Sequence, residues 1–380
     1  MVPLLVWTMS AGTMAYAVLA VTAAPMLDDL GIGATELGIV LLTYSASAAV
    51  LSPIAGRLSD RIGATRTAQL TLFLTGIAYP AMGLMSSTAA LAVAALPIGL
   101  AQATINPSTN GLIAAHVPDG RRGLITGIKQ SGVYVGFVFV GITAPLAVQW
   151  WSWRAAFFVV GAVCLLGGVL SLFGLPPTES ELDEHGARTP IAESAKPHVR
   201  RLAVYAGLMG LASSTSSFIP LFAETELGYS NAAAGLYTAM VGVIAVAVRI
   251  LAGAAAEHRV RPGRLLQVMG GFGVVTSVLL LASAVVPALL WAAGVAYALG
   301  PAPWNAVAMF AIIVLVGRGA SGTATGWVVG SFSAGLAAGP LVYGPVIDGL
   351  GFPPVWGVAA VAALVAAIVI GRFRAEPVQA

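Results

Sequence analysis

The stretch GRLSDRIGATR, from Gly56 to Arg66, lies between two long apolar runs. Gly56 has no side chain and lets two helices approach closely, and Gly63 allows the backbone to reverse direction. Asp60 and Arg61 are too polar for the hydrocarbon of a membrane, so they mark the water boundary. The stretch therefore predicts a tight turn between two membrane helices on the cytoplasmic side.

A related stretch occurs about 197 positions further along the chain. It reads RILAGAAAEHRVRPGR, starts at Arg249, and aligns Glu257 with Asp60. A second pair of blocks, shifted by about 199 positions, aligns Asn305 with Asn106. A period this long indicates duplicated domains rather than a solenoid of short repeats. The sequence therefore predicts two related halves.

The pattern G-x-x-x-D-R-x-G, which begins at Gly56, resembles the signature turn between helices 2 and 3 of the major facilitator superfamily. The resemblance covers both halves and the linker between them. Ala64 and Thr65 depart from it, because the family usually has basic residues there, and Glu257 and His258 replace Asp-Arg in the second copy. The resemblance implies an all-α integral membrane protein with twelve transmembrane helices in two six-helix, pseudo-symmetric halves. It does not indicate the substrate.

Composition supports the membrane assignment independently. Hydrophobic residues make up 58% of the chain and charged residues 9%, and the mean hydropathy is +0.91. A soluble domain has about 25% charged residues, so this chain cannot cover itself with a polar surface. The net charge of +3 is spread over short loops and does not indicate nucleic-acid binding. We interpret the first apolar run as a retained helix rather than a signal peptide.

The sequence lacks the motifs of common enzymes and metal sites. Cys164 is the single cysteine, which excludes an intrachain disulfide and a thiolate metal cluster. The chain has no phosphate loop of the G-x-x-x-x-G-K type. Its histidines lie in or beside predicted cytoplasmic loops, without metal-ligand spacing. We therefore expect no enzyme activity, no cofactor and no metal.

Twelve runs are long enough to cross a membrane, which takes about 20 mostly apolar residues. They cover residues 2–25, 36–56, 67–86, 88–115, 122–147, 154–175, 200–223, 232–256, 264–285, 287–316, 321–345 and 352–372. The intervening segment 176–199 is polar and poor in aromatic residues. We therefore expect an N-terminal six-helix half at 1–175, a cytoplasmic linker at 176–199 and a C-terminal six-helix half at 200–380.

Lysine and arginine placement predicts the orientation, since cytoplasmic loops are enriched in both. One side of the predicted helices, here called the basic face, holds Arg57, Arg61, Arg66, Arg121, Arg122, Arg188, Lys196, Arg200, Arg201, Arg259, Arg261, Arg264, Arg318, Arg372 and Arg374. The opposite side, the acidic face, holds Arg154 together with Asp28, Asp29, Glu36, Glu224, Glu226 and Asp348. We expect a multi-pass protein of the cell membrane with both termini in the cytoplasm.

Two basic residues fall inside predicted helices. Arg249 lies about 12 Å, and Lys129 about 10 Å, from the basic face at 1.5 Å per residue. Charges at such depth usually face a partner or a water-filled cavity, so both are candidates to bind an anionic solute. Alternatively, Lys129 snorkels to the interface, and Arg249 bonds helix-end carbonyls or pairs with Glu257. None of the predicted spans buries a carboxylate at mid-membrane.

Uncharged polar residues in the predicted helices form a weaker layer of candidates. Most of the serines and threonines are better explained as helix-to-helix hydrogen bonds, worth about 0.6 kcal/mol each. In the family that the chain resembles, helices 1, 4, 7 and 10 line the cavity. The resemblance therefore favours Tyr16, Asn106, Trp304 and Asn305 as substrate-binding residues.

The signature turn also predicts a conformational latch. In the family, the acid that matches Asp60 faces the start of helix 11. We expect Asp60 to act on helix 11 and Glu257 on helix 5, with Gly56, Arg61 and Gly63 shaping the turn. Both carboxylates would hold the cytoplasmic side shut.

The function that follows is secondary active transport by alternating access. The leading hypothesis is transport of a small organic anion such as a carboxylate, in symport with protons, by a monomer in the lipid bilayer. A second hypothesis is efflux of a drug-like or natural-product molecule by proton antiport. The predicted fifth helix weakens it, because that helix has no proline until Pro145, whereas drug antiporters of the family tend to have a glycine-proline signature there. A third hypothesis is a membrane receptor or scaffold without transport.

Overall fold

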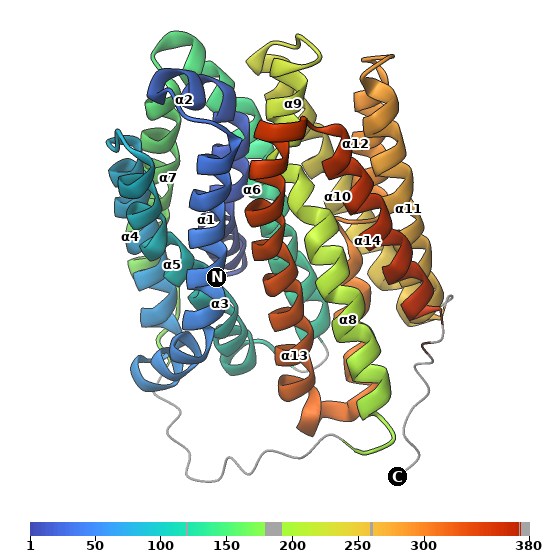
Figure 1. The fold of residues 1–380 in the computed structure, drawn as a ribbon. Helices are drawn as coiled ribbons and strands as arrows, with labels where there is room; N and C mark the ends of the chain where they lie inside the picture. The colour runs from blue at the N-terminus through green and yellow to red at the C-terminus, as the bar shows by residue number, and fades with distance from the viewer. Residues whose placement is uncertain (119–120, 179–191, 259–260, 372, 374–380) are drawn as a thin grey trace. The chain divides into compact units, whose positions relative to one another are not determined.

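The structure is a computed structural model that describes residues 1–118, 121–178, 192–258, 261–371 and 373. All regular elements in these ranges are helical. Figure 1 shows the helices with their labels. Their bounds are α1 Val2–Val21, α2 Ala23–Leu30, α3 Ala34–Ile62, α4 Ala64–Gly83, α5 Thr88–His116, α6 Arg122–Trp150, α7 Trp153–Gly174, α8 Lys196–Ser213, the 3-10 helix η2 Ser214–Ser217, α9 Ile219–Thr225, α10 Asn231–His258, α11 Pro262–Ser283, α12 Leu289–Leu299, α13 Trp304–Leu350 and α14 Pro353–Ile370.

The apolar runs become helices because a helix satisfies every backbone polar group within its own segment, as hydrocarbon requires. Nine helical spans within the described ranges are long and apolar enough to cross a membrane. The all-α membrane class predicted from the sequence is confirmed.

The predicted helices differ from the observed ones at three places. The predicted helix 200–223 is interrupted by η2, and the predicted helix 287–316 breaks at Gly300–Pro303. Pro301 and Pro303 have no backbone N–H to continue a helix. The predicted loop at 317–320 is helical instead, so α13 runs continuously for 47 residues. That loop contains glycine and arginine but no proline.

The predicted turn is much shorter than expected, because Gly63 alone separates α3 from α4. Its φ of 85° lies in the region that favours glycine. A Cβ at Gly63 would also lie 2.6 Å from the carbonyl oxygen of Thr178. The backbone N–H of Thr65 donates to Thr178 Oγ1 at 2.9 Å, and the Thr65 hydroxyl donates to the carbonyl of Pro176 at 2.5 Å. The beginning of the segment after α7 is therefore fastened to the turn.

The chain forms two compact units. Unit 1 contains residues 1–183 and 217–243, and unit 2 contains residues 184–216 and 244–380. In unit 1, α3 packs against α5, α1 against α6, and α4 against α7. The start of α10 also belongs to unit 1 and approaches α6 so closely that a Cβ at Gly235 would clash with the carbonyl oxygen of Gly141.

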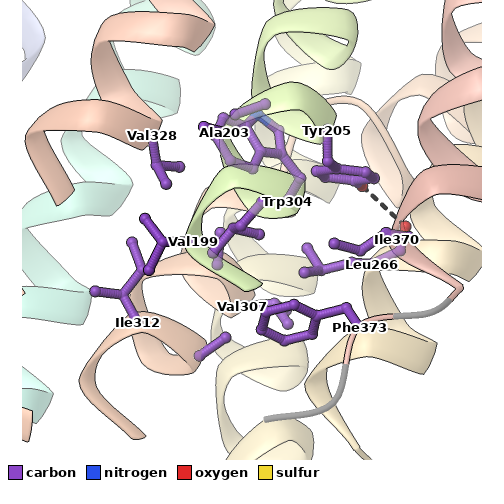
Figure 2. Packing of buried hydrophobic residues seen from close by; sticks show 14 of the residues in the cluster. Val199, Ala203, Tyr205, Leu266, Trp304, Val307, Ile312, Val328, Ile370 and Phe373 are labelled. Carbon is purple, nitrogen blue, oxygen red and sulfur yellow. Dashed lines mark hydrogen bonds between the residues drawn. The ribbon is translucent and has the colours of Figure 1, made fainter. Parts of the chain in front are cut away.

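In unit 2, α8 packs against α13 and α11 against α14. Figure 2 shows the core of this unit, where Tyr205, Trp304, Leu266 and Phe373 lie among aliphatic side chains. The Tyr205 hydroxyl donates to the carbonyl of Leu266 at 2.8 Å.

Candidate functional site

The most unusual polar group of unit 1 is the ammonium of Lys129 on α6, whose side chain is 0% exposed. Its Nζ donates to Asn110 Oδ1 at 2.6 Å, to Thr109 Oγ1 at 2.8 Å and to Asn106 Oδ1 at 3.3 Å. An ammonium has three donors, and each here meets an uncharged oxygen from α5. Gln130 Nε2 also donates to Asn106 Oδ1, at 3.4 Å. We call Lys129, Asn106, Thr109 and Asn110 the Lys129 cluster.

The sequence of α5 explains why these oxygens converge. Positions 106, 109 and 110 are spaced by three and four residues, so their side chains share one helix face. The predicted alternative, in which Lys129 snorkels, does not match this geometry, because the ammonium is turned into the α5–α6 pair. Burying a cation costs several kcal/mol unless it is compensated. Hydrogen bonds from a charged donor return about 1.5–3 kcal/mol each. No carboxylate of the described residues is among the hydrogen-bond partners of Lys129.

Tyr16 lies in a second polar group of unit 1, between α1 and α3. Its hydroxyl shares a short hydrogen bond with the Ser45 hydroxyl. Its ring meets the edge of Tyr44, with the centroids 5.1 Å apart, and Tyr44 donates to the carbonyl of Gly12 at 2.7 Å.

α1 and α5 connect this group with the Lys129 cluster. A Cβ at Gly12 would lie 3.2 Å from Gln102 Oε1, so the Gln102 side chain lies against α1. Gln102 Oε1 is buried and has no hydrogen-bond partner among the described residues. Gln102 is four residues before Asn106 on α5, so the amides share a face. This face offers further hydrogen-bonding capacity beside Lys129.

The basic residue of unit 2 is Arg249 on α10, with a side chain that is 7% exposed. Its Nη2 donates to the carbonyl oxygen of Ala302 at 3.4 Å. Ala302 belongs to the segment that separates α12 from α13, just beyond the carboxyl end of α12. The contact is therefore to a carbonyl of the segment between the two helices, and the alternative in which Arg249 bonds helix-end carbonyls stays a prediction.

Trp304 and Asn305 open α13 but lie in different environments. Trp304 is 3% exposed, and its ring centroid lies 5.0 Å from that of Phe332 and 6.1 Å from that of Tyr205. Figure 2 shows Trp304 within the core of unit 2, which gives it a packing role. Asn305 is half-buried, and its Oδ1 lacks a hydrogen-bond partner among the described residues. Asn305 therefore keeps an acceptor available three residues after Ala302.

The predicted latch lies largely outside what the structure describes. Gly56 and Asp60 fall within α3 and Glu257 within α10, but the side chains of Asp60 and Glu257 are outside the described part. Arg61 is exposed, and Gly63 forms the turn. The latch stays a prediction.

Sequence reasoning singled out Asn106 but not Gln102, Thr109, Asn110 or Gln130. The available signal was the spacing of 102, 106, 109 and 110 along one face of a helix next to a lysine-bearing helix. Among the described residues, no group of three or more His, Cys, Asp or Glu side chains could hold a metal ion. The side chains described here can bind a polar or anionic solute through their amides, hydroxyls and buried cations.

Comparison with known proteins gives the chain's relatives. Residues 4–312 match the family model described as the Major Facilitator Superfamily. The hexuronate transporter of Bacillus subtilis is 23% identical over 171 residues, which cover 44% of this chain and 40% of that protein. The D-galactonate transporter of Escherichia coli O6:H1 is 24% identical over 399 aligned positions, covering 92% of this chain and 89% of that protein. The match to the first of these relatives thus spans less than half of its length.

Among solved structures, that of a point mutant of the nucleoside transporter NupG is similar, with a TM-score of 0.75. The alignment covers 97% of this chain and 98% of NupG, at 13% sequence identity. At that identity the likeness concerns the fold alone.

Proposed function

Since the chain belongs to the Major Facilitator Superfamily and is a multi-pass membrane transporter, we propose that it carries a small organic anion of the sugar-acid type. The solute would bind near mid-membrane, and alternating access would expose it to each side in turn. Expected partners are the solute, protons and the bilayer.

The observation that carries this proposal is the environment of Lys129. The fully buried Lys129 ammonium is held by three uncharged oxygens and has no counter-charge among its described partners. An anionic solute that approaches the cluster would supply the missing counter-charge. A structural lysine at such depth would normally be paired with a carboxylate.

The amides of the cluster suit the remainder of such a solute. A sugar acid has one carboxylate and several hydroxyl groups. Asn106 and Asn110 present their oxygens to Lys129, and each retains an NH₂ group that can donate to a hydroxyl or carboxylate. The names of the relatives, a hexuronate and a D-galactonate transporter, agree with this solute class.

In unit 2, Arg249 and Asn305 are the side chains that we assign to the solute. A guanidinium binds a carboxylate through two parallel hydrogen bonds, and Asn305 Oδ1 is a buried acceptor suited to a hydroxyl. Tyr16 stays in the proposed site through its hydroxyl next to Ser45. We do not assign Trp304, because its packing in the core of unit 2 accounts for it. Proton symport, a cytoplasmic basic face and the Asp60 and Glu257 latches complete the proposal.

Counterflow in proteoliposomes tests the proposal. Vesicles loaded with unlabelled D-galactonate should take up labelled D-galactonate, whereas matched vesicles with galactose, the neutral sugar, should exchange little. Equal exchange of both sugars would overturn the anionic-solute proposal. No exchange of any sugar acid would favour the receptor or scaffold hypothesis, provided that the purified protein is folded.

The direction of coupling separates symport from efflux. A proton gradient directed into the vesicles, with the outside more acidic, should drive accumulation of the anion if protons and solute move together. Accumulation of a drug-like cation against an opposite gradient, with no effect on D-galactonate, would favour efflux by proton antiport instead.

A further inference from the structure

The acidic end of unit 1 contains a polar clasp that the proposed solute site does not use. The amide nitrogen Nδ2 of Asn231, the first residue of α10, donates to the carbonyl oxygen of Val21 at 2.6 Å. The same nitrogen lies 3.0 Å and 3.2 Å from the two carboxylate oxygens of Glu224 on α9. Val21 is the last residue of α1. Asn231 and Glu224 thus tie the α9–α10 region to the end of α1.

The Glu224 carboxylate differs from the other carboxylates at this end. It is half-buried, and its described hydrogen-bond partner is a neutral amide. Nearby on α2, Asp29 accepts from Arg154 Nη1 at 2.5 Å, so that arginine is occupied. Asp28, also on α2, lines a pocket with residues of α9. α1 and α10 contribute a carbonyl and an amide to the clasp.

These surroundings suit a proton. Protonation removes the charge of Glu224 without breaking an ion pair, because no described lysine, arginine or histidine is paired with it. The neutral acid also gains an O–H donor. Asn231 Oδ1, on the side chain that donates to Glu224, is buried and has no hydrogen-bond partner among the described residues. The clasp therefore contains a proton acceptor, the Glu224 carboxylate, and a hydrogen-bond acceptor without a described partner, Asn231 Oδ1.

We propose that Glu224, clasped by Asn231 to the end of α1, is a proton-binding site at the acidic face. One proton from water at that face adds to one carboxylate oxygen and leaves by the same route. A neutral carboxylic acid is buried at lower cost than a carboxylate. Proton binding and docking of α9 and α10 on α1 are therefore linked, and each favours the other. The assignment rests on the proposed transport function only where it concerns solute exchange.

Infrared difference spectroscopy tests the site directly. Purified full-length protein is acidified from mildly alkaline to mildly acidic pH, and the C=O stretching band of protonated carboxyl groups is followed. Wild type should gain a band that Glu224→Gln lacks, and the matched control Asp28→Asn should retain it. Identical spectra for wild type and Glu224→Gln would overturn the assignment. This measurement needs no solute, so it decides the site even if the anion proposal fails.

Exchange measurements test the link to transport. Counterflow of D-galactonate at equal pH on both sides should change with pH in wild type and become flat in Glu224→Gln. Glu224→Asp, which keeps an ionisable group, should restore the dependence with a shifted midpoint. An unchanged pH profile in Glu224→Gln would overturn the link between the proton and docking. Unfolding temperatures of all variants show whether each is folded.

Discussion

The two buried cations of this protein are held in contrasting ways. Lys129 in unit 1 is surrounded by side-chain oxygens of α5, the helix that precedes its own in the chain. Arg249 in unit 2 reaches the carbonyl of Ala302, which lies 53 positions later in the segment that interrupts the predicted tenth helix. One cation thus depends on side chains that mutation can remove, and the other contacts the backbone.

The difference matches the chemistry of the two groups. An ammonium is a compact point charge with three donors, and the Lys129 cluster offers three acceptors. A guanidinium is a wide planar fork, and a carbonyl accepts from it at one Nη atom, 3.4 Å away. We conclude that side chains of α5 hold the Lys129 ammonium, whereas the Arg249 guanidinium contacts the backbone between α12 and α13.

The largest expected effect is that of Lys129→Gln. Removing the charge should reduce D-galactonate counterflow about tenfold or more, equivalent to about 1.4 kcal/mol or more of lost binding. The unfolding temperature should stay the same or rise, because the substitution removes a buried charge that has no counter-charge among its described partners. The exposed residue Lys196 provides the control Lys196→Gln. A large loss of stability with normal counterflow would instead make Lys129 a structural residue.

Arg249→Lys should have a smaller effect on the same assay. The charge is kept, but the fork that fits a carboxylate is lost, so we expect counterflow to fall about threefold to tenfold. The unfolding temperature should change little. If Arg249→Lys instead lowers the unfolding temperature strongly along with D-galactonate counterflow, the arginine acts through the fold around Ala302 rather than on the carboxylate.

Two asparagines, Asn110 in unit 1 and Asn305 in unit 2, should differ in their effect on stability. Asn110→Ala removes one acceptor from Lys129 and should lower the free energy of unfolding by about 1 kcal/mol, a modest loss because Asn110 is exposed to water. Asn305→Ala removes an oxygen without a described partner and should change stability by less than about 0.5 kcal/mol. Thermal unfolding in detergent measures both. A larger loss of stability in Asn305→Ala than in Asn110→Ala would contradict this expectation.

The smallest effect is expected for an ion pair that is exposed to water. The hydrogen bond from Arg154 lowers the pKa of Asp29, with a further contribution from the Trp153 indole N–H at 3.0 Å. A lowered pKa means that the ionised group stabilises the fold above its ordinary pKa and that this contribution disappears as the pH falls through the lowered value. Asp29→Asn should therefore unfold slightly earlier than wild type at neutral pH and at the same temperature in acid. A constant difference across pH would exclude the ion pair as its cause.

The sequence predicted most of the helices because apolar runs of membrane length have few alternatives in hydrocarbon. It missed the breaks at Ser214–Ser217 and Gly300–Pro303, because both are short and lie within runs that remain apolar on average. It overestimated the length of the turn after α3, because Asp60 and Arg61 are polar but remain compatible with a helix.

The candidate site was predictable in part. The burial of Lys129 and Arg249 was expected from their positions inside predicted helices. The partners of Lys129 did not, because they depend on how α5 and α6 are rotated about their axes, which hydropathy does not determine. Trp304 illustrates a further limit: an aromatic residue in a cavity-lining helix can equally belong to the core, and the contacts with Tyr205 and Phe332 show that it does.

Residues 217–243 belong to unit 1 together with residues 1–183, which has a consequence for dividing the chain into fragments. Cleavage within 176–199 would yield two fragments, and the second would contain the start of α10 without α6. The close contact of Gly235 with Gly141 and Pro145 would then form only when the fragments meet. Co-expression of the two fragments should rescue folding of this part of the second fragment, whereas the second fragment alone would expose a glycine-lined surface to lipid.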